Sequence, residues 1–132
     1  MSNEFLSKGV KIAKLPSDYG SAGFKMFKGS FLNNVEVAYE TWGTLSINHD
    51  NVILLFTGLS PSSHAASSES NKSSGWWEYM IGPGKPIDTN KYFVICISSL
   101  GSCFGSTSPA SINKETGLVY GLDFPELSIE DI

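Results

Sequence analysis

The sequence contains no arginine, and its nine lysines are outnumbered by thirteen acidic residues, so the formal net charge is -4. A protein that binds nucleic acid gathers positive charge on one face, so we expect no nucleic-acid partner. The missing guanidinium group also excludes a rigid two-point clamp on a carboxylate from this chain.

Long apolar runs are missing as well. The longest are Val52–Phe56 and Phe93–Ile97, whereas a membrane-spanning helix needs about 20 apolar residues. Residues 1–14 carry mixed charges and lack the apolar segment of a secretory signal. We therefore expect no membrane association and a cytoplasmic location.

Cysteine is scarce. Cys96 lies inside an apolar run and Cys103 lies in a glycine-rich loop, and the two form neither a metal-ligand spacing nor a disulfide framework. The sequence thus predicts reduced thiols and no metal site.

The length of 132 residues allows one domain at most and is well below that of a complete α/β enzyme. We expect an amino-terminal arm over residues 1–21 and an incomplete α/β domain over residues 22–132. The last residues resemble the start of a helix, with Ser128 as its N-cap and acidic residues after it, so we expect the natural protein to continue beyond Ile132.

Two segments near the start show the pattern of strands. Phe24–Leu32 predicts a first strand, Asn33 and Asn34 a tight turn, and the alternating Val35–Thr41 a second strand that pairs with the first as a hairpin.

The pattern then changes to short continuous apolar runs, Val52–Phe56 and Tyr92–Ile97, which are typical of parallel strands covered on both faces. Trp76–Ile81 between them predicts a crossover helix that ends at Gly82. A strand, a helix and a parallel strand in this order give an α/β fold class.

The serine-rich segment 60–74 has the composition of a flexible linker. It nevertheless follows the carboxyl end of a predicted buried strand, where open α/β sheets place their ligand crevice. Its position therefore favours a functional loop.

Several longer motifs together resemble the amino-terminal third of the homoserine O-acyltransferase family, which has an α/β-hydrolase fold. The resemblance covers Phe24 to Ile132 and is carried by Gly75-Trp76-Trp77-Glu78, Ile81-Gly82-Pro83-Gly84-Lys85-Pro86-Ile87-Asp88-Thr89, Leu100-Gly101-Ser102-Cys103-Phe104-Gly105-Ser106-Thr107 and Tyr120-Gly121-Leu122-Asp123-Phe124-Pro125. It implies a truncated α/β-hydrolase fold that contains only the amino-terminal strands and the first crossover helix.

The resemblance also implies an activity for the full protein. Such an enzyme moves an acyl group from acyl-CoA, its co-substrate, to the hydroxyl of L-serine or L-homoserine in cysteine or methionine biosynthesis, holds no bound cofactor and forms a homodimer. Its Ser-Asp-His triad and a substrate-binding arginine would lie beyond Ile132, so these 132 residues alone are predicted to be inactive.

The loop after Phe56 would set the chemistry and the substrate. By the resemblance, the backbone N–H of Leu59 is half of the oxyanion hole. Homoserine acetyltransferases carry a Thr-Gly-Asp-Ser-His-like stretch where this chain has Ser60-Pro61-Ser62-Ser63-His64, which is more similar to the serine O-succinyltransferase branch. Residues expected to influence substrate choice are Gly58, Leu59, Ser60, Pro61 and Ser62.

Other candidates for catalytic residues have simpler interpretations. Gly101–Gly105 fits a nucleophile elbow with Cys103 as a thiol nucleophile, but the residues that follow do not favour a helix, so a structural loop is preferred. Ser60 lacks the second glycine of an elbow and precedes Pro61. His64 is interpreted as a polar anchor of the loop rather than a catalytic base.

Glu78 and Asp88 could be paired carboxylates for acid/base catalysis. The preferred interpretation has Glu78 solvated, Asp88 in the turn before the next strand, and one of the neighbouring tryptophans packed on the sheet. Two alternatives stay open for the whole chain: a cysteine hydrolase that uses Cys103, and a non-catalytic subunit completed by another chain.

Overall fold

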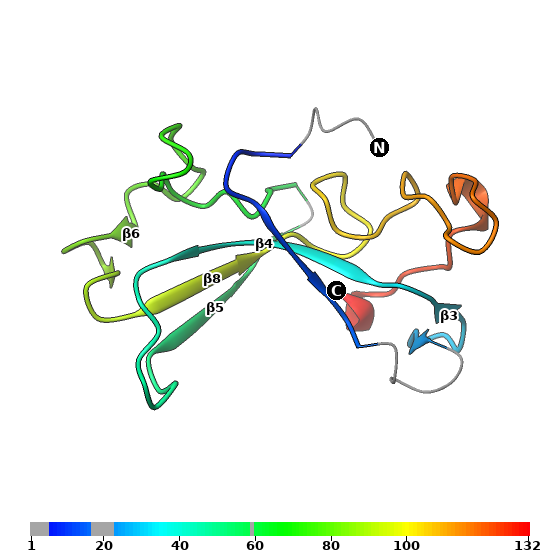
Figure 1. The fold of residues 1–132 in the computed structure, drawn as a ribbon, viewed down its shortest axis with the longest axis horizontal. Coiled ribbons are helices and arrows are strands. Elements are labelled where there is room, and N and C mark those ends of the chain that lie inside the picture. Colours follow the sequence, from blue (N-terminus) through cyan, green and yellow to red (C-terminus); the bar gives the residue numbers. More distant parts are fainter. Residues whose placement is uncertain (1–5, 17–22, 59) are drawn as a thin grey trace.

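The structure is a computed structural model and describes residues 6–16, 23–58 and 60–132. Its centre is a four-stranded sheet in the order β1-β4-β8-β5 (Figure 1). The strands are β1 (Lys11–Lys14), β4 (Glu36–Trp42), β8 (Phe93–Ile97) and β5 (Val52–Phe56). Strand β4 pairs with β1 and β8 in antiparallel fashion, whereas β5 and β8 are parallel, as predicted.

The predicted hairpin between residues 24–32 and 35–41 is wrong. Strand β2 (Phe24–Lys25) instead pairs with β3 (Phe31–Leu32) in a small separate hairpin. Gly29, at φ 92°, allows the reversal between them, and the N–H of Met26 donates to the carbonyl of Ser30 at 2.8 Å. The turn at Asn34 is confirmed by its positive φ of 54°.

The partner of β4 on one side comes from the segment that we expected to be a loose arm. Lys11 pairs with Tyr39 and Lys14 with Glu36, so the expectation is wrong for these four residues. All four β1 side chains are exposed, and strand pairing is made by the backbone, so no hydrophobic pattern marked this strand. The expected division between residues 21 and 22 stays a prediction.

The predicted crossover helix over Trp76–Ile81 is also wrong, because residues 76–80 form turns and Ile81 begins a strand. The N–H of Trp77 donates to the carbonyl of Ala65, and the carbonyl of Glu78 accepts a hydrogen bond from the Lys85 ammonium group. Long-range partners therefore hold the backbone of a segment too short to stabilise a helix by itself. Strands β6 (Ile81–Gly82) and β7 (Ile87–Asp88) follow as a short parallel pair.

The described residues contain no α-helix. Two 3-10 turns are present, η2 (Gly121–Asp123) and η3 (Ile129–Asp131). The predicted helix start at Ser128 is confirmed as the residue before η3, where Asp131 accepts hydrogen bonds from both the N–H and the hydroxyl of Ser128 at 2.9 Å. No helix in the described ranges has the length and apolar character that crossing a membrane requires.

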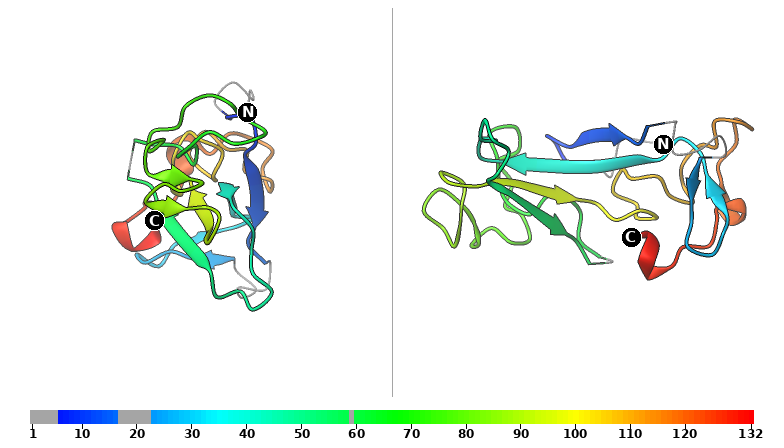
Figure 2. Two further views of the ribbon diagram at one scale, coloured as in Figure 1. Left: turned by 90° about the vertical axis from the view of Figure 1, so that its left-hand side faces the viewer. Right: turned by 90° about the horizontal axis from the view of Figure 1, so that it is seen from below.

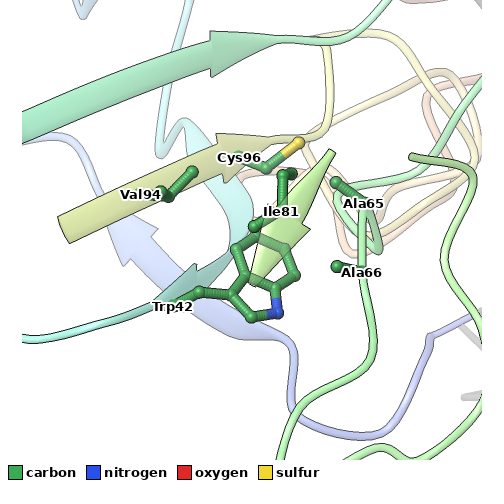
Figure 3. Packing of buried hydrophobic residues seen from close by; sticks show 6 residues of the cluster. All are labelled: Trp42, Ala65, Ala66, Ile81, Val94 and Cys96. Carbon is green, nitrogen blue, oxygen red and sulfur yellow. The ribbon is translucent and has the colours of Figure 1, made fainter. Parts of the chain in front are cut away.

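The main core lies on one face of the sheet (Figure 3). The serine-rich segment contributes two fully buried side chains, so it is not a linker. The cluster consists of Trp42, Ala65, Ala66, Ile81, Val94 and Cys96, with Trp77 packed against it as expected for one of the two tryptophans. A second cluster, built around Met26, Leu32 and Val35, lies beneath the β2–β3 hairpin.

The side chains of β5 are much more exposed than we expected for a strand covered on both faces. Val52, Leu54 and Phe56 are 44%, 49% and 64% exposed, whereas Val94 and Cys96 of β8 are fully buried. The expectation of coverage on both faces is therefore wrong for β5. Strand β5 is also the last strand in the sheet order, so it forms an exposed apolar edge.

The remaining segments lie at the two ends of the sheet. The β2–β3 hairpin and the chain around η2 lie at one end, and the β6–β7 pair lies at the other, as Figure 2 also shows. Residues 60–75 connect the carboxyl end of β5 with the β6 end, which places them beside the sheet rather than away from it.

Candidate functional site

The candidate site is built on the carboxyl ends of the two parallel strands. Phe56 and Ile97 are partners in the register, so β5 and β8 end level with each other. Hydroxyl groups join the residues that follow these strands. Thr57 Oγ1 lies 3.2 Å from Ser99 Oγ, and the Ser99 hydroxyl also donates to the carbonyl oxygen of Thr57 at 3.3 Å. Both side chains are buried, so the two strand ends are held in a fixed relation.

The loop that leaves β5 is fixed again a few residues later. The N–H of Ser63 donates to Ser98 Oγ at 2.9 Å, and the indole N–H of Trp76 donates to the carbonyl of Ser62 at 2.9 Å. Ser63 is fully buried. The described residues at both ends of this loop are therefore anchored to the sheet and to Trp76, as a loop that binds an oxyanion requires.

His64 provides a further buried anchor. Its Nδ1 lies 3.0 Å from Glu40 Oε2, and its Nε2 lies 3.0 Å from the carbonyl oxygen of Ser73. The prediction that His64 holds the loop is confirmed by these contacts. Sequence reasoning missed Glu40, although an acidic residue on the same strand face as Ala38 and Trp42, both buried, was a usable signal.

Four of the five residues predicted to influence substrate choice are described, and they follow the carboxyl end of β5. Gly58 and Ser60 are exposed, Pro61 and Ser62 are half-buried, and an added Cβ at Gly58 would meet open space. Leu59 lies outside the described residues, so the assignment of its amide as an oxyanion donor stays a prediction.

Glu78 and Asp88 have structural roles, as preferred in the sequence analysis. Hydrogen bonds from the backbone N–H groups of Ser67 and then Gly75 lower the pKa of Glu78 to about 2. Glu78 is therefore held by the backbone, and its side chain is 33% exposed, so the expectation that it is solvated holds only in part. The N–H groups of Gly84 and Asn90 likewise hold the pKa of Asp88 below its usual range, at the end of β7 and directly before the turn that leads to β8.

Cys103 does not lie in a nucleophile elbow. The chain after it returns to β4 instead of opening into a helix: Ser106 Oγ accepts the N–H of Ala38 at 3.0 Å, and the N–H of Thr107 donates to the carbonyl of Glu36 at 2.8 Å. Cys103 is exposed, whereas burial of Cys96 raises its thiol pKa to about 12. The described part of the chain holds no group of three or more His, Cys, Asp or Glu residues able to bind a metal ion.

Curated relatives match the chain closely over most of its length. It is 68% identical over 108 residues to the serine O-succinyltransferase of Litchfieldella anticariensis, covering 82% of this chain and 29% of that protein. It is 54% identical over 129 residues to the serine O-succinyltransferase of Xanthomonas campestris pv. campestris, covering 98% of this chain and 33% of that protein. The chain thus spans about a third of the length of these relatives.

Solved structures give the same picture, although no protein-family model matches the chain. The homoserine O-acetyltransferase of Bacillus anthracis is similar over 95% of this chain and 34% of its own, with a TM-score of 0.79 and 37% identity. Esterase E22 is similar over 92% of this chain and 34% of its own, with a TM-score of 0.77 and 37% identity. The sheet, its connections and these similarities show that the chain belongs to the homoserine O-acyltransferase family and forms part of an α/β-hydrolase fold.

Proposed function

We propose that these residues serve an O-acyltransferase that moves an acyl group from acyl-CoA to the hydroxyl of an amino acid, L-serine or L-homoserine. The observation that carries the proposal is the fixed loop at the carboxyl edge of β5 and β8, in a chain 54% identical over 129 residues to a serine O-succinyltransferase. The cytoplasmic location and the homodimer expected from the family stay predictions.

The proposed role of this loop is to stabilise the oxyanion. A serine hydroxyl from outside these residues attacks the thioester carbonyl, the carbonyl oxygen gains negative charge, and the CoA thiolate leaves. The hydroxyl of the amino acid then attacks the carbonyl of the acyl-enzyme. The acylated amino acid leaves, and the catalytic serine regains its hydroxyl. Both steps pass through a tetrahedral oxyanion, which the N–H of Leu59 would stabilise. The contacts of Thr57 and Ser63 on either side support a preorganised donor.

The preferred acceptor in this proposal is L-serine, and the preferred donor is succinyl-CoA. The support is the Ser60-Pro61-Ser62-Ser63 sequence of the loop together with the names of the relatives. The residues that bind the substrate carboxylate would come from elsewhere, because the sequence contains no arginine.

A chimera tests the proposal. The matching third of the Xanthomonas relative is replaced by this chain, and the product is assayed with serine or homoserine and with succinyl-CoA or acetyl-CoA. We expect transfer to serine from succinyl-CoA to have the highest kcat/KM. A clear preference for homoserine would refute the assignment of substrate, and a folded chimera without any acyl transfer would refute the function.

Two variants of Leu59 in the same chimera test the oxyanion donor. Leu59→Pro removes the backbone N–H, and we expect kcat to fall about 100-fold to 1000-fold. Leu59→Ala keeps the N–H and serves as the matched control, with kcat within a few-fold of the parent. Equal activity of the two variants would contradict the assigned role. The 132-residue chain alone is predicted to have no transferase activity, because we expect the nucleophile to lie beyond Ile132.

A further inference from the structure

A buried acidic residue and a buried histidine meet beside the candidate loop, and the proposed mechanism uses neither. Glu40 is 2% exposed and His64 is 9% exposed, and their side chains contact each other at 3.0 Å. Burial of a carboxylate is costly unless each of its oxygens has a partner. A pair of this kind in the middle of a small sheet therefore requires an explanation.

Both oxygens of the Glu40 carboxylate are occupied. The hydroxyl of Ser7 donates to Oε1 at 2.6 Å, and His64 Nδ1 contacts Oε2. Because a carboxylate only accepts hydrogen bonds, Nδ1 carries the proton of this contact. Glu40 thus connects three parts of the chain: the amino-terminal segment before β1, strand β4, and the loop after β5.

The other side of His64 is held by the segment that follows the loop. With the proton on Nδ1, Nε2 accepts a hydrogen bond, and the hydroxyl of Ser73 lies 3.2 Å from it, while the His64 carbonyl accepts the N–H of Trp76 at 3.3 Å. The indole of Trp76 also binds the carbonyl of Ser62. The backbone of residues 62–64 is therefore fixed from the sheet side by Glu40 and from the opposite side by residues 73–76.

We propose that Glu40 and His64 form a positioning pair, which sets the conformation of residues 60–62 for acyl transfer while contacting neither substrate. The inference rests on the proposed function, since it assigns these residues to the loop that would stabilise the oxyanion. His64 is two residues beyond Ser62, so a shift of its ring moves the loop directly. Small displacements of a catalytic donor cost up to about 100-fold in rate.

The kinetic test uses the chimera described above. For Glu40→Ala and His64→Ala we expect kcat to fall about 10-fold to 100-fold with little change in the KM for acyl-CoA. The double variant should be no slower than the worse single variant, because the two residues act as one unit. Glu40→Gln and His64→Asn keep a hydrogen-bonding group at the contact and should recover most of the loss.

The matched controls lie on the surface. His49, the other histidine, is exposed at φ 57°, a conformation that asparagine tolerates, so His49→Asn should leave kcat unchanged. Glu69→Gln is the corresponding control for the carboxylate, since Glu69 is exposed. A comparable loss of kcat in the controls would overturn the proposal.

Amide hydrogen exchange in the same proteins gives a second readout that does not depend on activity. We expect faster exchange in residues 60–66 of His64→Ala and unchanged exchange in β4 and β8. Unchanged exchange in that loop, or an equal increase over the whole sheet, would overturn the positioning role. If the parent chimera folds but transfers no acyl group, the proposed function fails while the exchange result still decides whether the pair fixes the loop.

Discussion

A lysine in place of Leu54 should keep separate copies of this chain apart. Strand β5 is the last strand of the sheet, its five residues contain no charge, proline or glycine, and three of its side chains are about half exposed. Such an edge presents unpaired backbone groups to another copy. We therefore expect the 132-residue chain to associate through β5, and a lysine there to oppose this.

The size of the effect follows from the exposed fractions. Full burial of a large apolar side chain is worth about 1.5 to 3 kcal/mol, so covering the exposed half of Val52, Leu54 and Phe56 gives roughly 2 to 5 kcal/mol per chain. Association of two chains costs about 4 to 15 kcal/mol in lost freedom of motion. The burial energy of the two chains together matches only the low end of this range, so we predict weak, concentration-dependent association. Loss of Leu54 from both copies, about 2 kcal/mol, corresponds to a roughly thirtyfold weaker Kd.

Sedimentation velocity over a concentration series measures this association directly. Leu122→Lys is the matched control, because Leu122 is fully exposed in η2. The segment that contains η2, orange in Figure 1, lies at the opposite end of the molecule from the loop that leads into β5. We expect Leu54→Lys to shift the distribution toward monomer and Leu122→Lys to leave it unchanged. A parent chain that stays monomeric at every concentration and unfolds cooperatively would refute the reasoning, as would equal effects of the two lysines.

Three further outcomes follow from the fold. Gly75→Ala should lower the free energy of unfolding in urea by about 1 to 3 kcal/mol, because its Cβ would lie 2.2 to 2.4 Å from backbone atoms of Ala65 and Ala66. In the control Gly58→Ala the added Cβ meets open space, so this variant should be neutral or slightly stabilising. Equal urea midpoints for the two variants would contradict this prediction. Glu78 has a lowered pKa in the folded chain, so its contribution to stability is present above about pH 4.5 and is lost as the pH falls toward about 2; in Glu78→Gln this part of the acid dependence should vanish, and an unchanged acid transition would argue against it. Iodoacetamide should modify Cys103 in the folded chain and Cys96 only after unfolding, as read by mass spectrometry, and early modification of Cys96 would contradict its burial.

Local patterns predicted the parallel strands but not their neighbours. The apolar runs at residues 52–56 and 92–97 marked β5 and β8, because continuous apolar residues are typical of parallel strands, although one face of β5 is exposed. Strand β1 carried no such mark, because its four side chains are exposed and only its backbone pairs with β4. The helix expected at residues 76–81 did not form, since the Ala65 carbonyl and the Lys85 side chain, both outside this segment, occupy its backbone groups.

The candidate site divides in the same way. Position in the chain identified residues 57–64 as the loop at the carboxyl edge, and residue chemistry identified His64 as an anchor rather than a base. Nothing local connected His64 with Glu40, which lies 24 residues earlier, or with Ser73. Such contacts depend on how β4 and the loop pack together, which a local pattern does not encode.

By itself, the sequence determined the family, the α/β class and the strand that leads into the loop, because these depend on residue identity and short-range periodicity. The tertiary structure decided which strands pair with β4, where the backbone of residues 76–81 finds its hydrogen bonds, and that a buried carboxylate holds His64. Each of these is a long-range contact, and its stability comes from burial and hydrogen bonding between segments that are distant in the chain.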